Sequence, residues 1–274
     1  MKLPDKFDLS SSDKYILIFE IADEMYSYSM YNPVEDGSFF YHEIEKQKHE
    51  NLFADFKDFF YDNEFLAASY RKICVINNTS DFTFIPTNVF NDKNKEEFFR
   101  FGFSDNEDKV LVQSIKKPEL TILHGISEEV IDFFNRSFDM PQFFHHLSPL
   151  LSYFGEKVNL GNAHRLIVNF KNKGLDILYY APFGEFIFAN HFKYNHLNDA
   201  VYYIFFIWKQ FGLSQLKDFI YVAGNSFQKL ELIKLIQKYV HNVLPVNITP
   251  TEHFSGVDIQ NISFELLSFT LCEL

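Results

Sequence analysis

The sequence predicts an α/β protein of two domains, each of which opens with an antiparallel three-strand meander that leads into helices and further strands. Three observations predict this class. Short β-rich and alternating segments separated by turn residues open each half of the chain, and apolar residues at helical spacing follow each of these openings. Between the halves, the segment 155–163 holds two glycines and two asparagines and has little apolar periodicity. We therefore divide the chain into domains at 1–160 and 161–274.

The first half begins with three short strands. Residues 14–31 contain two of them, separated by a turn at Ala22-Asp23-Glu24, and 39–44 forms the third after the turn-rich segment 32–38. Residues 51–70 place phenylalanines and leucines at helical spacing between charged side chains, which predicts one or two amphipathic helices. The other elements expected in this half are strands at 72–76, 82–85, 110–115 and 119–123, helices within 91–101 and 127–138, and a strand followed by a helix within 143–154.

The second half repeats this opening. Strands at 164–170, 175–180 and 185–192 are joined by turns that each contain a glycine, and a long helix at 197–211 follows. The repeat is one of architecture, since the residues themselves do not repeat. The remaining elements expected are a strand at 218–223 that runs into Gly224-Asn225-Ser226, a helix at 227–239, a strand at 242–246 and a C-terminal helix within 258–271.

Composition excludes several classes of function. The 274 residues include 37 acidic side chains against 25 Lys and Arg, which gives a net charge of −12. A chain with this charge and no basic stripe is a poor ligand for nucleic acid or for an anionic membrane. The 35 Phe and 15 Tyr lie mostly at strand or helix spacing beside aliphatic residues, which indicates core packing.

The chain is also expected to be cytoplasmic. Its two cysteines, about 200 residues apart, form neither a disulfide framework nor a metal-binding C-x-x-C pair. Its first eight residues contain acids and a proline where an export signal would have an apolar run, and the longest apolar run, 200–208, is too short to span a bilayer. We expect no membrane insertion.

The order of elements, with one three-strand meander opening each half, resembles the actin-like ATPase superfamily of sugar kinases, heat-shock chaperones and bacterial pilus-assembly and cell-division proteins. More closely, the whole chain is similar to an uncharacterised bacterial family assigned to that fold. The resemblance implies two ribonuclease-H-like domains with a nucleotide between them, and a last helix that packs back on the first domain. The alternative for that helix is a docking role.

In the superfamily, the turns of the two opening hairpins hold the phosphates and each typically reads Asp-x-Gly. A carboxylate is needed for hydrated magnesium, and a glycine lets backbone N–H groups approach the phosphates. The first hairpin here has Glu20 and Asp23 but lacks the glycine. The second has Gly174 but carries Asn169 and two lysines where a carboxylate is expected.

The turn that contacts adenosine in the superfamily usually reads small-Gly-Gly after a strand. Here Ala223-Gly224-Asn225-Ser226 follows a strand and precedes a helix, and it is the best preserved of the three turns. A plain strand-to-helix turn explains the same residues, and a solvated hairpin turn explains Glu20 and Asp23. The resemblance thus implies a hypothetical cofactor site made of Glu20, Asp23, Asn169, Gly174, Gly224, Asn225 and Ser226.

The sequence contains none of the common hydrolase motifs. The sequence has no Gly-x-Ser-x-Gly elbow, no Walker loop and no His-Glu-x-x-His. His145 and His146 are adjacent, and neighbours on a strand project to opposite faces, so we expect no shared metal there. Cys74 lies inside an apolar strand and is expected to be a buried, inert thiol.

We therefore expect a non-catalytic or weakly nucleotide-binding actin-like protein, a pseudo-ATPase that serves as an interaction or scaffold module for a protein partner or for a second copy of itself. ATP with magnesium is the cofactor that the resemblance implies, and the incomplete turns argue against it. The alternative is an active ATPase or kinase with relocated carboxylates, for which Asp13, Glu20, Asp23, Asp176 and Glu185 are the candidates.

Overall fold

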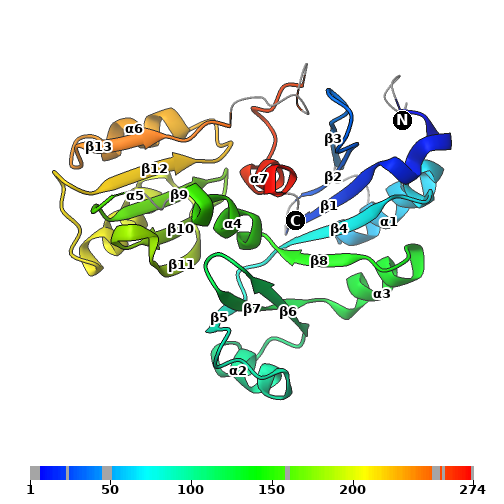
Figure 1. Cartoon of the computed structure of the whole chain (residues 1–274), viewed down its shortest axis with the longest axis horizontal. Helices are drawn as coiled ribbons and strands as arrows, with labels where there is room; N and C mark the ends of the chain where they lie inside the picture. The colour runs from blue at the N-terminus through cyan, green and yellow to red at the C-terminus, as the bar shows by residue number, and fades with distance from the viewer. Residues whose placement is uncertain are drawn as a thin grey trace. The chain divides into compact units, whose positions relative to one another are not determined.

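The computed structural model describes residues 7–22, 25–44, 51–157, 161–248, 254 and 257–272. It contains two compact units, and each takes its residues from separate parts of the chain (Figure 1). Unit 1 comprises Met1–Ser114, Leu120–His146 and Pro250–Ile259, and unit 2 comprises Ile115–Glu119, Leu147–Thr249 and Gln260–Leu274.

Unit 1 is built on a five-stranded sheet of order β3-β2-β1-β4-β8. The first three strands are antiparallel, while β4 pairs parallel with β1 and β8 pairs parallel with β4. The meander predicted from the sequence is therefore confirmed. The strands are β1 (Ile16–Ala22), β2 (Tyr26–Tyr31), β3 (Phe40–Ile44), β4 (Lys72–Asn78) and β8 (Gln142–His145).

Helices α1 (Leu52–Asp62) and α3 (Glu128–Ser137) cover one face of this sheet. Phe56 of α1 and Phe134 of α3 are fully buried against Phe19 of β1, with ring centroids 5.2–5.7 Å apart. Burying one such ring stabilises the fold by about 1.5–3 kcal/mol, so this aromatic cluster dominates the core of unit 1. Short 3₁₀ helices occur at Leu9–Lys14, Glu64–Ala67 and Asp92–Asn94.

A smaller sheet of order β5-β7-β6 also belongs to the first half of the chain. Helix α2 (Lys95–Gly102) packs on it and buries Phe99 completely in a small core with Ile85, Val110 and Leu123. The strands are β5 (Phe82–Pro86), β6 (Lys109–Ile115) and β7 (Leu120–Ile126).

Unit 2 repeats the strand order of the first sheet. Its sheet has the order β11-β10-β9-β12-β13, in which β9, β10 and β11 form the antiparallel meander and β12 and β13 add parallel strands. The second predicted meander is confirmed as well. The strands are β9 (Arg165–Phe170), β10 (Gly174–Tyr180), β11 (Phe186–Lys193), β12 (Phe219–Ala223) and β13 (Asn242–Pro245).

Among the described residues of this unit are four α-helices and a short 3₁₀ helix, Pro182–Gly184, between β10 and β11. Helices α5 (Leu197–Gln210) and α6 (Lys229–Ile236) share a core with one face of β9, β10, β12 and β13. Helices α4 (Leu147–Lys157) and α7 (Phe264–Cys272) pack on each other, and the rings of Phe154 and Phe264 stack at 5.7 Å. A division of the chain at residue 160 stays a prediction.

None of the helices in the described part of the chain combines the length and the apolar character needed to cross a bilayer.

Candidate functional site

The second opening hairpin, formed by β9 and β10, carries a buried network of polar side chains. Asp176 lies opposite Asn169 on β9 and opposite His191 on β11. Directly opposed residues of antiparallel strands project from the same face of a sheet, so these three side chains meet. Asn169 Nδ2 donates to Asp176 Oδ2 at 2.9 Å, and His191 Nδ1 donates to Asp176 Oδ1 at 2.7 Å. Both oxygens of the Asp176 carboxylate are therefore engaged within the sheet.

Lys171, the first residue after β9, joins this network to helix α7. Its Nζ lies 3.0 Å from Asp176 Oδ2 and 2.7 Å from Glu265 Oε1. Both carboxylate side chains are fully buried, and the Lys171 side chain is 15% exposed. Burial alone would lower the pKa of Lys171, but the adjacent charges of Asp176 and Glu265 outweigh this effect and raise it well above its ordinary value. Lys171 is thus a permanent internal cation that neutralises buried carboxylates.

Two further residues fix the geometry of this hairpin. Gly174 starts β10, and a Cβ atom there would come within 2.6 Å of His191 Cε1. The glycine therefore makes room for the imidazole ring that binds Asp176. Tyr194 donates its hydroxyl hydrogen to the backbone carbonyl of Lys171 and so holds the turn from the side of β11.

Gly224 lies in the turn after β12 and has φ +100°, in the left-handed region that favours glycine. A Cβ atom there would overlap the backbone nitrogen and carbonyl oxygen of Phe170, the last residue of β9. Ser226 N donates to the same carbonyl oxygen at 3.2 Å, and Asn225 Nδ2 donates to the carbonyl of Asn261 at 3.1 Å. The close approach of the turn to the backbone of Phe170 therefore explains why a glycine is needed at this position, and no ligand has to be invoked.

A lysine also occupies this turn. Lys229, the first residue of α6, donates from Nζ to the carbonyls of Gly224 and Val246 at 3.2 and 3.1 Å and to Asn247 Oδ1 at 3.3 Å. Partial burial lowers the pKa of Lys229. The three hydrogen bonds from its ammonium group connect the turn to the residues that follow β13.

The five site residues predicted in unit 2 lie at one edge of the sheet. Ala223, which precedes Gly224, pairs with Asn169, and Gly224 contacts Phe170, which follows Asn169. The residues brought to this edge are Asn169, Gly174, Gly224, Asn225 and Ser226. That they bind a cofactor stays a prediction.

The first opening hairpin is described only in part. Glu20 of β1 is buried, and Ser27 on the paired strand donates to its Oε2 at 3.5 Å. Asp23 and Glu24, the acids of the turn, lie outside the described residues.

The other candidate carboxylates are dispersed within each unit. In unit 2, Asp176 is enclosed in the ion network, whereas Glu185 is exposed at the other end of β10, beyond Tyr180. In unit 1, Asp13 is exposed on a 3₁₀ helix that precedes β1, and Glu20 is buried near the end of that strand. Neither unit by itself brings two of the described candidates together.

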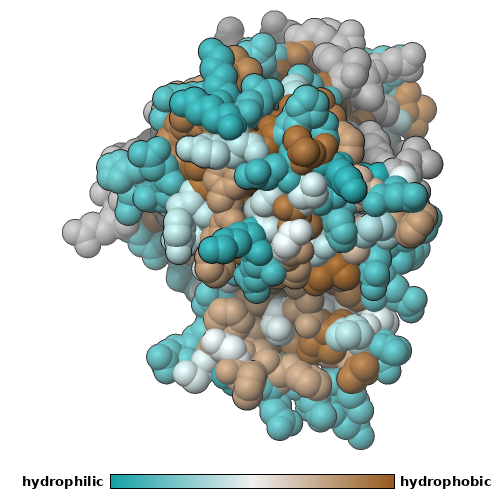
Figure 2. Space-filling view, turned by 90° about the vertical axis from the view of Figure 1, so that its left-hand side faces the viewer, coloured by the Kyte–Doolittle hydropathy of each residue, from teal (hydrophilic) through white to brown (hydrophobic). Residues whose placement is uncertain are grey.

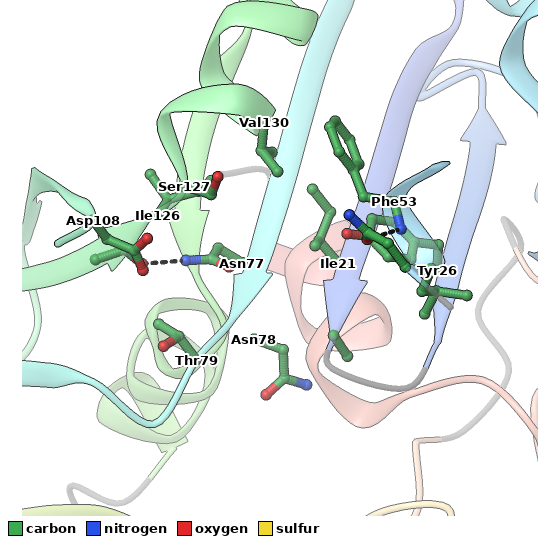
Figure 3. A pocket seen from close by; sticks show the side chains of 14 residues that line it. Ile21, Tyr26, Phe53, Asn77, Asn78, Thr79, Asp108, Ile126, Ser127 and Val130 are labelled. Carbon is green, nitrogen blue, oxygen red and sulfur yellow. Dashed lines mark hydrogen bonds between the residues drawn. The ribbon is translucent and has the colours of Figure 1, made fainter. Parts of the chain in front are cut away.

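Unit 1 contains a cavity of about 590 Å³ at the carboxyl ends of β1 and β4 (Figure 3). Figure 3 shows Ile21, Tyr26 and Phe53 on one side of it and Asp108, Asn77 and Thr79 on the other. Ligand sites of α/β sheets commonly lie beyond the carboxyl ends of parallel strands. The remaining lining residues are Ala22, Asn51, Leu52, Asn78, Gly125, Ile126, Ser127 and Val130.

The adjacent histidines differ from the expectation. His145 ends β8 and His146 follows it, and the two rings are only 4.3 Å apart between centroids rather than on opposite faces. The strand ends between them, so the alternation of strand side chains no longer applies. His124 on β7 is fully buried near them, 5.3 Å from the His145 ring. Burial and the nearby His146 lower the pKa of His124 to about 3.

Sequence reasoning missed the partners that complete the network. Glu265 is 94 residues from Lys171, and no local pattern connects them. No local pattern indicates the role of His191 either, and its position opposite Asp176 follows only once the register of β10 and β11 is known. The one available signal was Glu265, the single charged residue of a helix that is otherwise made of apolar and hydroxyl side chains.

Comparisons with known proteins agree with this architecture. A family model described as a protein of unknown function (DUF3822) matches residues 4–243. A Bacteroides thetaiotaomicron protein with an actin-like ATPase fold and unknown function is 24% identical to the chain, with a TM-score of 0.82, over 97% of this chain and 99% of that chain. The type IV pilus biogenesis complex of PilM and PilN matches with 12% identity and a TM-score of 0.56, over 94% of this chain and 96% of that chain. No curated protein matches the chain.

These matches establish the fold, which is that of the actin-like ATPases and agrees with the class predicted from the two meanders. They leave the activity open, since the most similar of these structures has an unknown function itself. The family model covers most of the chain, and the chain belongs to the DUF3822 family.

Proposed function

We propose that this actin-like protein is non-catalytic and works by binding a protein partner or a second copy of itself. The observation that carries the proposal is the ammonium group of Lys171, which sits between the buried carboxylates of Asp176 and Glu265 in the second hairpin. In the superfamily that the fold resembles, this hairpin serves magnesium and phosphate.

Magnesium would have to compete with this internal cation. Hydrated magnesium needs an accessible carboxylate, and both oxygens of Asp176 already bind Asn169, His191 and Lys171 at 2.7–3.0 Å. Displacing Lys171 would also leave Glu265 buried without a cation, and an unpaired buried charge costs several kcal/mol. The hairpin is therefore stable without a metal and poorly suited to receive one.

The turn after β12 supports the same proposal. Gly224 is required by the backbone of Phe170, and Lys229 fills the turn with its own ammonium group. The features that resembled a nucleotide-binding turn thus have internal roles.

Binding to a protein partner is supported by a structural neighbour and by the surface. One structural neighbour is a chain of the PilM–PilN type IV pilus biogenesis complex. On this chain, Tyr202 and Phe206 of α5 stack at 6.1 Å and are 62% and 51% exposed. Figure 2 shows hydrophobic side chains interspersed with hydrophilic ones on one face of the molecule. Exposed paired aromatics are typical of protein interfaces.

Calorimetry with ATP and ADP, with and without magnesium, tests the proposal. A ligand at 100 times its dissociation constant would stabilise the fold by about 2.7 kcal/mol, so thermal melts provide an independent readout. We expect neither heat nor a melting shift up to millimolar nucleotide. Saturable, magnesium-dependent binding would contradict the proposal and favour the alternative of an active ATPase or kinase.

Light scattering then distinguishes the two kinds of partner. A dimer that dissociates in the Tyr202→Ala/Phe206→Ala variant, but not in a Leu216→Ala control, would assign the α5 surface to a second copy. Leu216 is a suitable control because it is 76% exposed and lies outside α5. If the protein is monomeric at all concentrations, we would infer that its partner is a different protein.

A further inference from the structure

The cavity of unit 1 has the size of a small-molecule site. Its volume of about 590 Å³ lies within the range of roughly 300–1,000 Å³ that is usual for such sites. It is formed by the ends of β1 and β4, by the end of β7 and by the first residues of α1 and α3. The lining residues that the structure describes all belong to unit 1.

The walls of this cavity differ in chemistry. Ile21, Tyr26 and Phe53 supply an apolar side, on which the rings of Tyr26 and Phe53 stack at 6.2 Å (Figure 3). The opposite side presents the carboxylate of Asp108 together with the amide of Asn77 (Figure 3). Asn77 is fixed there, because its Nδ2 donates to the carbonyl of Gly125 at 2.8 Å. A ligand with one apolar part and one polar part would match both walls.

Asp108 is held rigidly at the cavity. Its backbone N–H donates to Asn106 Oδ1 at 2.8 Å, and its carbonyl accepts from Arg100 Nη2 at 2.8 Å. Its side chain packs against Gly125, where an added Cβ atom would lie 3.0 Å from Asp108 Cβ and 3.2 Å from Oδ2. The carboxylate therefore stays beside Gly125, which also lines the cavity.

The charge of Asp108 is only partly compensated. Partial burial raises its pKa, the charge of Asp81 adds to this effect, and Asn106 and Arg100 oppose it. Within the described part of the chain, no Lys, Arg or His nitrogen lies within 4 Å of this carboxylate. A partly desolvated carboxylate without an ion pair gains stability from any cation that reaches it.

We propose that this cavity binds a small organic cation, a primary amine with an apolar group, whose ammonium pairs with Asp108 and whose apolar part contacts Ile21, Tyr26 and Phe53. A phosphorylated ligand would meet repulsion from Asp108. A bare divalent cation is a poor match as well, since calcium takes six to eight oxygen ligands and usually several carboxylates, whereas Asp108 is the one acid among the described lining residues.

The test uses 2-phenylethylamine as the probe, with 2-phenylethanol as its neutral analogue and 3-phenylpropionate as its anionic analogue. Binding to the whole chain is followed by ligand-observed NMR and by calorimetry. We expect saturable binding of the amine, weakening with salt, and binding at least ~10-fold weaker for the alcohol and for the Asp108→Asn protein, which corresponds to about 1.4 kcal/mol. The control variant is Asp105→Asn, which removes an exposed acid from the same loop and should bind like the original protein.

Several outcomes would overturn this proposal. Equal binding of the amine and the alcohol, or equal binding to the original protein and to Asp108→Asn, would show that the carboxylate does not contribute to binding. An absence of saturable binding in the millimolar range would show that the cavity is not a site for such amines. Binding of a lysine-terminated peptide but not of the free amine, with the same dependence on Asp108, would assign the cavity to a protein partner instead. None of these residues belongs to the Lys171 network, so this proposal and the proposed function fail separately.

Discussion

Replacing Lys171 by methionine should destabilise unit 2 strongly. Methionine keeps much of the length of the lysine side chain but removes the charge, so Asp176 and Glu265 stay buried beside each other without their shared cation. Removing one partner of a buried ion pair typically costs about 3–5 kcal/mol. Both carboxylate side chains are fully buried, so we expect a loss within this range.

The assay is denaturant unfolding followed by the fluorescence of Trp208. This is the one tryptophan in the chain, it is 4% exposed, and it lies in the core of unit 2, so its signal reports that unit. The matched control is Lys173→Met, since Lys173 is exposed in the same turn and should change stability by less than about 0.5 kcal/mol.

The pH dependence of this effect has a defined sign. The folded pKa of Lys171 is raised above 10.5, so its stabilising effect is complete at pH 8 and is lost only as the pH rises through the raised value. The Lys171→Met protein lacks this contribution at every pH. The difference in stability from the original protein should therefore shrink as the pH rises through the raised pKa of Lys171.

A double variant tests whether the charges are coupled. Lys171→Met combined with Glu265→Gln should lower the free energy of unfolding by less than the sum of the two single changes. The reason is that Glu265→Gln removes a buried charge that Lys171→Met leaves without a cation. A loss of less than about 0.5 kcal/mol in Lys171→Met, or strict additivity in the double variant, would refute the internal ion network as a source of stability.

Two further predictions concern other residues. Gly224→Ala should destabilise unit 2 by more than about 1 kcal/mol, because the new Cβ overlaps the backbone of Phe170 and the φ of +100° strains it; Trp208 fluorescence checks this, and an unchanged midpoint would contradict it. The free energy of unfolding of unit 1 should decrease as the pH falls from 6.5 toward 3, by at most about 1.4 kcal/mol per pH unit. In this pH range His124 is protonated in the unfolded chain but stays neutral when it is buried in the folded protein. Hydrogen exchange in β7 follows this loss, and a slope that is the same in His124→Gln would show that another group titrates.

Much of the fold could be predicted from local sequence patterns. Alternating residues and turn chemistry located both meanders, and the spacing of residues such as Phe53, Phe56 and Phe60 located α1. These features are short-range, so they can be read within a window of 10 to 20 residues. Helix lengths were less well predicted: 51–70 contains an 11-residue α-helix and a short 3₁₀ helix, and α6 covers only Lys229–Ile236 of the expected 227–239.

The candidate site was predicted only in its outline. The incomplete turn at Asn169 was recognised, but the network that fills the hairpin depends on sheet register and on a helix at the far end of the chain. Gly224 was identified for its resemblance to a ligand-binding turn, whereas its neighbour Phe170 shows that close backbone packing requires it. Long-range contacts of this kind leave no local pattern in one sequence.

The ammonium group of Lys171 offers the most direct test of the central claim that an internal ion network occupies the second hairpin. A buried, ion-paired ammonium should give a slowly exchanging lysine N–H signal in a ¹H–¹⁵N spectrum, and Lys171→Met identifies it by its loss. We expect this signal to persist unchanged when millimolar ATP and magnesium are added. A saturable shift or loss of the signal with magnesium and ATP would show that the hairpin exchanges its internal cation for a ligand, and would contradict the account.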